Sequence, residues 1–97
     1  MDKAVFVSII TPDSTENQTN EYLDELEFLA NTAGIDGEKR FTQRVEKPNS
    51  RTYVGEGKIE EIKEYISDKE IHLAIFDDEL TGAQVRNLEK ELFCEIL

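Results

Sequence analysis

The sequence predicts an α/β fold built on a small four-stranded parallel sheet. Strand-like and helix-like segments alternate in the order β-α-β-α-β-α-β, which is typical of parallel strands joined by right-handed crossovers, with helices on both faces of the sheet. The first and third strand segments are apolar and belong in the centre of the sheet, whereas the second is half polar and belongs at an edge. We therefore expect the strand order 2-1-3-4 in a single domain, residues 1–97.

Four short segments carry the strand signals. Residues 4–10 (AVFVSII) and 72–76 (HLAIF) are apolar runs whose length suits strands buried on both faces. Residues 38–46 alternate between an apolar and a polar face, and the charged side chains of this strand discourage edge-to-edge association. Residues 93–97 form the fourth predicted strand.

The first predicted helix follows a capping box formed by Thr15 and Gln18. It ends before Gly34, because glycine readily adopts the left-handed conformation of a C′ residue. Its apolar stripe is predicted at Tyr22, Leu26, Leu29 and Ala33, with Leu23 and Ala30 widening it.

Two further helices are predicted in the second half of the sequence. One begins after Gly57, with its inner side at Ile59, Ile62 and Ile66. The other follows a second capping box, Thr81 with Gln84, and has its inner face at Val85, Leu88 and Leu92.

The charge distribution singles out one segment. The net charge of −11 argues against indiscriminate binding of nucleic acid. Residues 38–58, however, carry six basic and three acidic side chains, a net of +3, within an otherwise acidic chain. Two interpretations stay open: the segment contacts RNA phosphates, or it is a solvated basic edge. The candidate nucleic-acid-binding residues are Lys39, Arg40, Arg44, Lys47, Arg51 and Lys58.

A glycine-rich stretch, RTYVGEGKIEEI, has the look of a phosphate loop that runs into a helix. A Walker A loop requires G-x-x-x-x-G-K-[ST], but Thr52 occupies the first glycine position and Ile59 the hydroxyl position. A dinucleotide fingerprint also fails, because its third glycine falls at Glu60. Either Gly57, as a helix N-cap, and Lys58 contact an anion, or the glycine simply turns the chain into the helix.

Three acids, Asp77-Asp78-Glu79, directly follow the buried third strand. The carboxyl ends of parallel strands collect ligand groups, so a magnesium or phosphotransfer site is one interpretation. A receiver domain is excluded, because the first strand ends in Thr11-Pro12 instead of an acid pair. The alternative is a charged loop in which one acid stabilises the N-terminus of the next helix.

The remaining reactive residues predict neither a metal site nor a catalytic one. His72 is the single histidine and has no cysteine cluster beside it, which argues against zinc. Cys94 is the single cysteine, and its apolar neighbours indicate a buried thiol in a reducing compartment. The sequence has neither a leader nor an apolar run long enough for a membrane span, so we expect a cytoplasmic protein.

Two long motifs in the right order resemble the N-terminal domain of HflX-type GTPases. The first is RVEKPNSRTYVGEGKIEEI (44–62), with the pattern K-P-x-x-x-T-Y-x-G-x-G-K, and the second is IFDDELTGAQVRNLEKEL (75–92). The likeness covers nearly the whole chain, and one departure is Gly82, where proline is usual. The matched positions, which mark a special surface or domain contact, are Lys47, Tyr53, Gly55, Gly57, Lys58, Asp77, Asp78, Arg86 and Asn87.

The resemblance implies a fragment of a longer protein whose coiled-coil and GTPase domains lie outside this chain. It implies binding to the large ribosomal subunit and its rRNA by a non-catalytic module, in a parent protein that splits stalled ribosomes. GTP and Mg²⁺ would then belong to the parent, and this fragment would have no cofactor and no enzymatic activity. The alternative is a nucleotide-binding or autoinhibitory domain that acts on the GTPase domain of the same chain.

Overall fold

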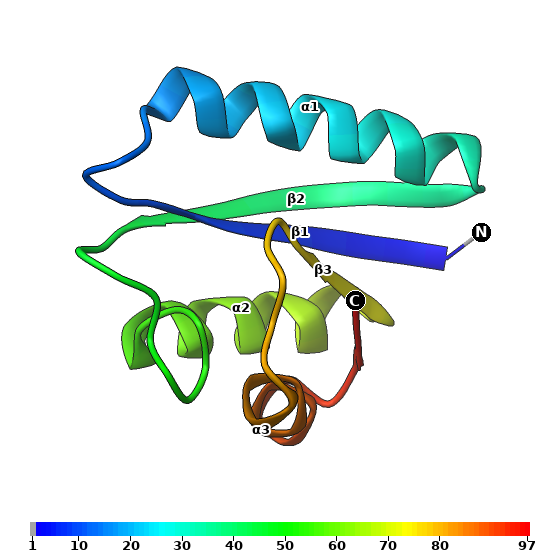
Figure 1. Cartoon of the computed structure of the whole chain (residues 1–97). Helices are drawn as coiled ribbons and strands as arrows, with labels where there is room; N and C mark the ends of the chain where they lie inside the picture. Colours follow the sequence, from blue (N-terminus) through cyan, green and yellow to red (C-terminus); the bar gives the residue numbers. More distant parts are fainter. Residues whose placement is uncertain (1) are drawn as a thin grey trace.

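The computed structural model describes residues 2–97 and confirms the predicted α/β fold (Figure 1). All strand pairs are parallel, and the strand order is β2-β1-β3-β4, as predicted. The elements along the chain are β1 (Asp2–Ile10), α1 (Glu16–Thr32), β2 (Ile35–Arg44), α2 (Glu56–Lys69), β3 (Leu73–Phe76), α3 (Gly82–Leu92) and β4 (Glu95–Ile96).

The helices form one layer on each side of the sheet. Within residues 2–97, α1 alone covers one face, and α2 and α3 cover the other (Figure 1). This division follows from right-handed crossovers. The chain moves across the sheet in one direction from β1 to β2, and in the opposite direction from β2 to β3 and from β3 to β4. The larger core cluster lies under α2 and α3 and includes Val5, Val7, Ile62 and Leu88, all fully buried. No helix in the described range is long and apolar enough to cross a membrane.

Strand boundaries differ from the predicted ones by a few residues. β2 begins at Ile35 instead of residue 38, because the chain turns at Gly34 (φ +83°) and pairs at once with Asp2 of β1. β4 shrinks to two residues, because Phe93 takes a left-handed conformation (φ 55°) as the C-cap of α3. The polar second strand does lie at the sheet edge.

The apolar face of α1 is rotated relative to the prediction. Leu23 and Ala30 are buried against the sheet, whereas Tyr22 and Leu29 are 60% and 56% exposed. A single helix on one face of a sheet buries only a narrow strip of its own surface. In α1 the strip that packs on the sheet is the one that contains Leu23. The residues predicted to widen the stripe are therefore its centre.

The start of α2 is also corrected. The N-cap is Gly55 instead of Gly57, and the first helical residue is Glu56. The Gly55 carbonyl accepts the first helical hydrogen bond from the Ile59 N–H at 3.0 Å. Gly57 lies within the first turn, where an added Cβ would meet nothing within 4 Å.

Candidate functional surface at the carboxyl edge of the sheet

The strand order reverses between the carboxyl ends of β1 and β3. One connection leaves toward each face of the sheet there, which is where ligands bind in open α/β folds. In this structure the segment between β2 and α2, residues 45–55, packs against these strand ends through Tyr53; we call it the connector. Its Tyr53 is 2% exposed and packs edge-to-face on Phe76, with ring centroids 5.5 Å apart.

The connector is ordered by its own hydrogen bonds. Asn49 and Tyr53 exchange two backbone hydrogen bonds of 2.9 Å each. The Asn49 side-chain oxygen accepts from the N–H groups of Arg51 at 2.8 Å and Thr52 at 3.1 Å, and the Thr52 hydroxyl donates to the Val54 carbonyl at 2.9 Å. Tyr53 takes a positive φ of 68° to close this turn. The segment between two regular elements is thus a compact loop with a defined shape.

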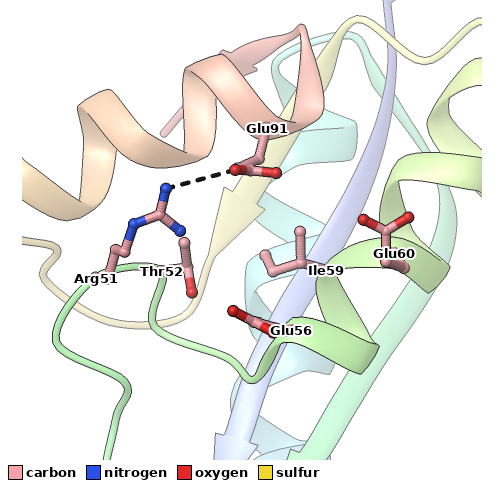
Figure 2. Close-up of a pocket in the computed structure, with 6 residues that line it drawn as sticks. All are labelled: Arg51, Thr52, Glu56, Ile59, Glu60 and Glu91. Atoms are coloured by element: carbon pink, nitrogen blue, oxygen red, sulfur yellow. Dashed lines mark ion pairs between the residues drawn. The ribbon is translucent and has the colours of Figure 1, made fainter.

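Helix α3 contacts the connector through three side chains. Gln84 Nε2 donates to the Asn49 carbonyl at 2.8 Å, and Asn87 Nδ2 donates to the Arg51 carbonyl at 3.1 Å. Glu91 pairs with the Arg51 guanidinium at 3.5 Å, and Figure 2 shows Arg51 reaching across to it. The two motifs singled out in the sequence therefore touch each other in space.

A small polar cluster lies where the connector meets the strand ends. The Ser8 hydroxyl, on a side chain 3% exposed, donates to Asp77 Oδ2 at 3.3 Å. Burial raises the pKa of Asp77, the Ser8 hydrogen bond opposes the shift, and the Asp78 charge adds to it. Burial, followed by the charges of Asp78 and Asp77, also raises the pKa of Tyr53, so its hydroxyl stays protonated. Asp77 is thus half-buried, with one carboxylate oxygen against the buried Ser8 hydroxyl.

Replacing Asp77 by asparagine is expected to stabilise the protein slightly at neutral pH. A carboxyl group whose folded pKa is raised binds its proton more tightly in the folded state. Stability therefore falls as the pH rises from the unfolded pKa of about 3.9 through the folded one. Asparagine keeps an acceptor for Ser8 and removes this penalty. The gain should be below about 1 kcal/mol, because the carboxylate is partly solvated.

Urea unfolding of the wild type and of Asp77→Asn at pH 7 and at pH 4 checks this expectation. The difference between the two proteins should shrink toward pH 4. A variant that is less stable at neutral pH would contradict the assignment of Asp77 as a destabilising charge.

The six candidate cations are not gathered on one face. Arg40 pairs with Asp24 at 2.8 Å and Glu27 at 2.7 Å on α1, whereas Lys39 lies over the Phe41 and Tyr65 rings on the side of α2. Burial alone would lower the pKa of Arg40, but Glu27 and Asp24 outweigh burial and raise it.

Two more of these cations have acidic partners, that of Arg44 on the neighbouring helix α1 and that of Lys58 within its own helix α2. Arg44 pairs with Glu16 at 3.0 Å, and Lys58 pairs with Glu61 at 2.9 Å. Lys47 and Arg51 are left on the exposed part of the connector. The basic segment is thus continuous in sequence but divided in space.

Neither the acids nor the single histidine and cysteine assemble a metal site. Asp78 Oδ1 accepts from the Glu79 N–H at 2.8 Å within its own loop. In the range 2–97, no group of three or more His, Cys, Asp or Glu residues lies close enough to hold a metal ion. His72 is exposed, and the half-buried Cys94 thiol has a pKa raised to about 11 by burial and by Glu89 and Glu95.

Three pockets surround the connector and differ in charge. One of about 300 Å³, drawn in Figure 2, is lined by Glu56, Glu60 and Glu91 against a single Arg51, so it disfavours phosphates. A second, of about 410 Å³, includes Arg44 and Glu46. The third, of about 500 Å³, contains Lys47 and no acid; its lining is Val45, Lys47, Pro48, Asn49, Ser50 and Gly55.

The motifs are evident in the sequence, but the contacts that their side chains make are not. The sequence predicts Gln84 only as a capping residue, and Gln43, which accepts from the Gly55 N–H at 2.9 Å, simply falls within the predicted strand 38–46. Gly82 stands at the first helical position of α3, where proline is favoured because its missing N–H has no helical partner, which explains why proline suits this site. Arg86 is exposed, with its guanidinium near Gly82.

The fold and the connector define a small parallel α/β domain that presents an ordered loop at the carboxyl edge of its sheet. Residues 20–97 match the family described as "GTP-binding GTPase N-terminal". The chain belongs to this family and is the N-terminal domain of an HflX-type GTPase.

Curated relatives agree with this assignment. GTPase HflX of Flavobacterium psychrophilum is 48% identical over 96 residues, 99% of this chain and 23% of that protein. GTPase HflX of Escherichia coli is 34% identical over 83 residues, 86% of this chain and 20% of that protein. The chain thus spans less than a quarter of the length of these relatives.

A GTP-binding protein from the hyperthermophilic archaeon Sulfolobus solfataricus, solved in complex with GDP, has the same fold. The TM-score is 0.69 at 22% identity, over 100% of this chain and 27% of that one. At this identity the likeness concerns the fold alone.

Proposed function

We propose that this domain is the non-catalytic ribosome-binding module of a cytoplasmic HflX-type GTPase, and that its connector contacts rRNA phosphates of the large subunit. GTP, Mg²⁺ and catalysis then belong to the GTPase domain of the parent protein, outside these 97 residues. The splitting of stalled ribosomes is likewise an activity of the whole protein. The relatives, which are named as GTPases, support this division of labour.

The observation that carries the proposal is the charge of the connector. The pocket of about 500 Å³ beside it contains Lys47 and no carboxylate, in a domain of net charge −11. Arg51 stands four residues further on, with its side chain 60% exposed and only a long contact to Glu91. Cations on an ordered loop supply phosphate contacts at little entropic cost, and the surrounding acids limit binding to other RNA surfaces.

The alternative of a nucleotide site at the start of α2 has weaker support. The Gly55 N–H already donates to Gln43, and Glu56 adds a negative charge to the first turn. The Lys58 ammonium is engaged by Glu61. The ion pair of Lys58 and the negative charge of Glu56 both disfavour a phosphate at this helix start.

Charge removal on the connector tests the proposal. In the full-length protein, Lys47→Gln combined with Arg51→Gln should weaken binding to purified large subunits about tenfold. The slope of log affinity against log salt should fall by about 1.5, because two phosphate contacts are lost. Binding should be measured by sedimentation across a salt series.

The matched control removes two exposed lysines away from the connector, one at the start of β1 and one at the end of α2. Lys3→Gln combined with Lys69→Gln makes the same change in net charge and should leave the salt slope unaltered. Equal losses in the two double variants would refute a specific role for the connector, as would unchanged binding by the connector variant.

A further inference from the structure

We propose that α3 clamps the connector, with Gln84 and Asn87 as positioning residues that hold it in its RNA-binding shape. The inference rests on the proposed function for its last step only, because the clamp itself is a feature of the fold. It gives a joint purpose to two motifs that are separated in the sequence by residues 63–74.

Gln84 performs two tasks with one side chain. Its Oε1 accepts from the Thr81 N–H at 2.9 Å and so completes the capping box of α3. Its Nε2 donates to the Asn49 carbonyl at 2.8 Å. The side chain is only 6% exposed, so the amide nitrogen would be costly to leave without an acceptor. Capping uses only the oxygen, and a glutamate would have served that task equally well.

The capping box of α1 provides the internal comparison. Gln18 accepts from the Thr15 N–H at 3.0 Å in the same geometry, but its side chain is exposed. The buried amide of Gln84 is therefore explained by the connector and not by the cap.

Asn87 repeats the contact one helical turn further on. Its Nδ2 donates to the Arg51 carbonyl at 3.1 Å. Residues three apart on a helix have side chains about 5–6 Å apart, so Gln84 and Asn87 lie side by side on the face of α3 that meets the connector. The two amide donors thus hold two carbonyls of the same turn, those of Asn49 and Arg51.

The clamp acts on the segment that carries the cations. Asn49 and Arg51, whose carbonyls are held, flank Ser50, and Lys47 is two residues before Asn49. All of residues 46–51 are exposed, so packing contributes little to their order. A loop that is ordered before binding loses less conformational entropy when it meets RNA. Loosening the clamp should therefore weaken binding without removing a cation.

The test uses near-isosteric variants of the full-length protein. Gln84→Glu keeps the capping oxygen, deletes the Nε2 donor and sets a carboxylate against the Asn49 carbonyl. Asn87→Asp deletes the Nδ2 donor and sets a carboxylate against the Arg51 carbonyl. Gln18→Glu is the matched control in α1. Ala83→Glu, at an exposed position beside Gln84, controls for the added charge. Each protein is measured by peptide-resolved hydrogen exchange and by binding to purified large subunits.

Amides of residues 49–53 should exchange about tenfold faster in Gln84→Glu, and faster still in the double variant, because a lost hydrogen bond to a buried group has about this effect. Binding should fall about fivefold to tenfold in parallel, and neither control should move the exchange rates. Unchanged exchange in the double variant would overturn the clamp.

Faster exchange with full binding would overturn the positioning role while leaving the connector as the RNA contact. Removal of Lys47 and Arg51 separates this outcome from a failure of the proposed function. If that charge variant also binds normally, the connector is not the contact, and the exchange rates alone decide whether α3 holds it.

Discussion

Replacing Tyr53 by alanine is expected to lower the free energy of unfolding by about 4 kcal/mol, a large part of the stability of a domain of this size. The side chain is 2% exposed and joins the connector to the core through Phe76. Its removal leaves a cavity in the larger core cluster, next to Phe76 at the end of β3. The positive φ at this position gives alanine no compensating relief, because only glycine adopts it freely.

Chemical denaturation of Tyr53→Ala and Tyr53→Phe separates the ring from its hydroxyl. The phenylalanine variant should lose about 1 kcal/mol or less, because Ser8 and Asp77 remain hydrogen-bonded to each other. A loss in Tyr53→Phe equal to that in Tyr53→Ala would show that the hydroxyl, and not the ring, fastens the connector.

Replacing Gly37 by alanine is expected to cost about 2–3 kcal/mol. A Cβ at this position would lie 2.5 Å from Phe6 Cε2 and 3.2 Å from Glu27 Cγ. Phe6 is fully buried and cannot withdraw, and Glu27 is held by its bond to Arg40. The glycine thus permits α1 to approach β2 closely, next to the register shift between Ala4 and Val5.

Gly57→Ala is the matched control, since an added Cβ there meets nothing within 4 Å. In the first turn of α2 alanine should be neutral or stabilising by about 0.5 kcal/mol. Thermal unfolding of both variants, followed by circular dichroism, provides the comparison. Similar losses in the two proteins would mean that close packing at Gly37 is not the cause.

Local sequence signals predicted the architecture correctly because each acts over a few residues. The apolar run of β1 and the polar face of β2 were sufficient for the strand order, and both capping boxes form as predicted. The start of α2 was wrong by two residues, because both Gly55 and Gly57 are compatible with a helix N-terminus. Gln43, from another element, selects Gly55 through a hydrogen bond.

The candidate site was only partly predictable. The sequence indicated Lys47, Tyr53 and Asn87 through the family motifs, but a motif does not say which side chain is buried and which is exposed. Tyr53 turned out to pack in the core, and Asn87 to hold a carbonyl of the connector. The +3 charge of residues 38–58 also could not be read as one surface, because alternate residues of a strand point to opposite faces.

Short-range periodicity and motifs in the sequence establish the order and type of the elements, the edge position of β2 and the family of the domain. The tertiary structure alone decided which strip of α1 is buried, which cations keep a free charge, and that α3 holds the connector. Most of the contacts behind these features join residues more than ten positions apart, such as Arg40 with Glu27 and Gln84 with Asn49. Packing brings such residues together, and no local pattern records which partner a side chain will meet.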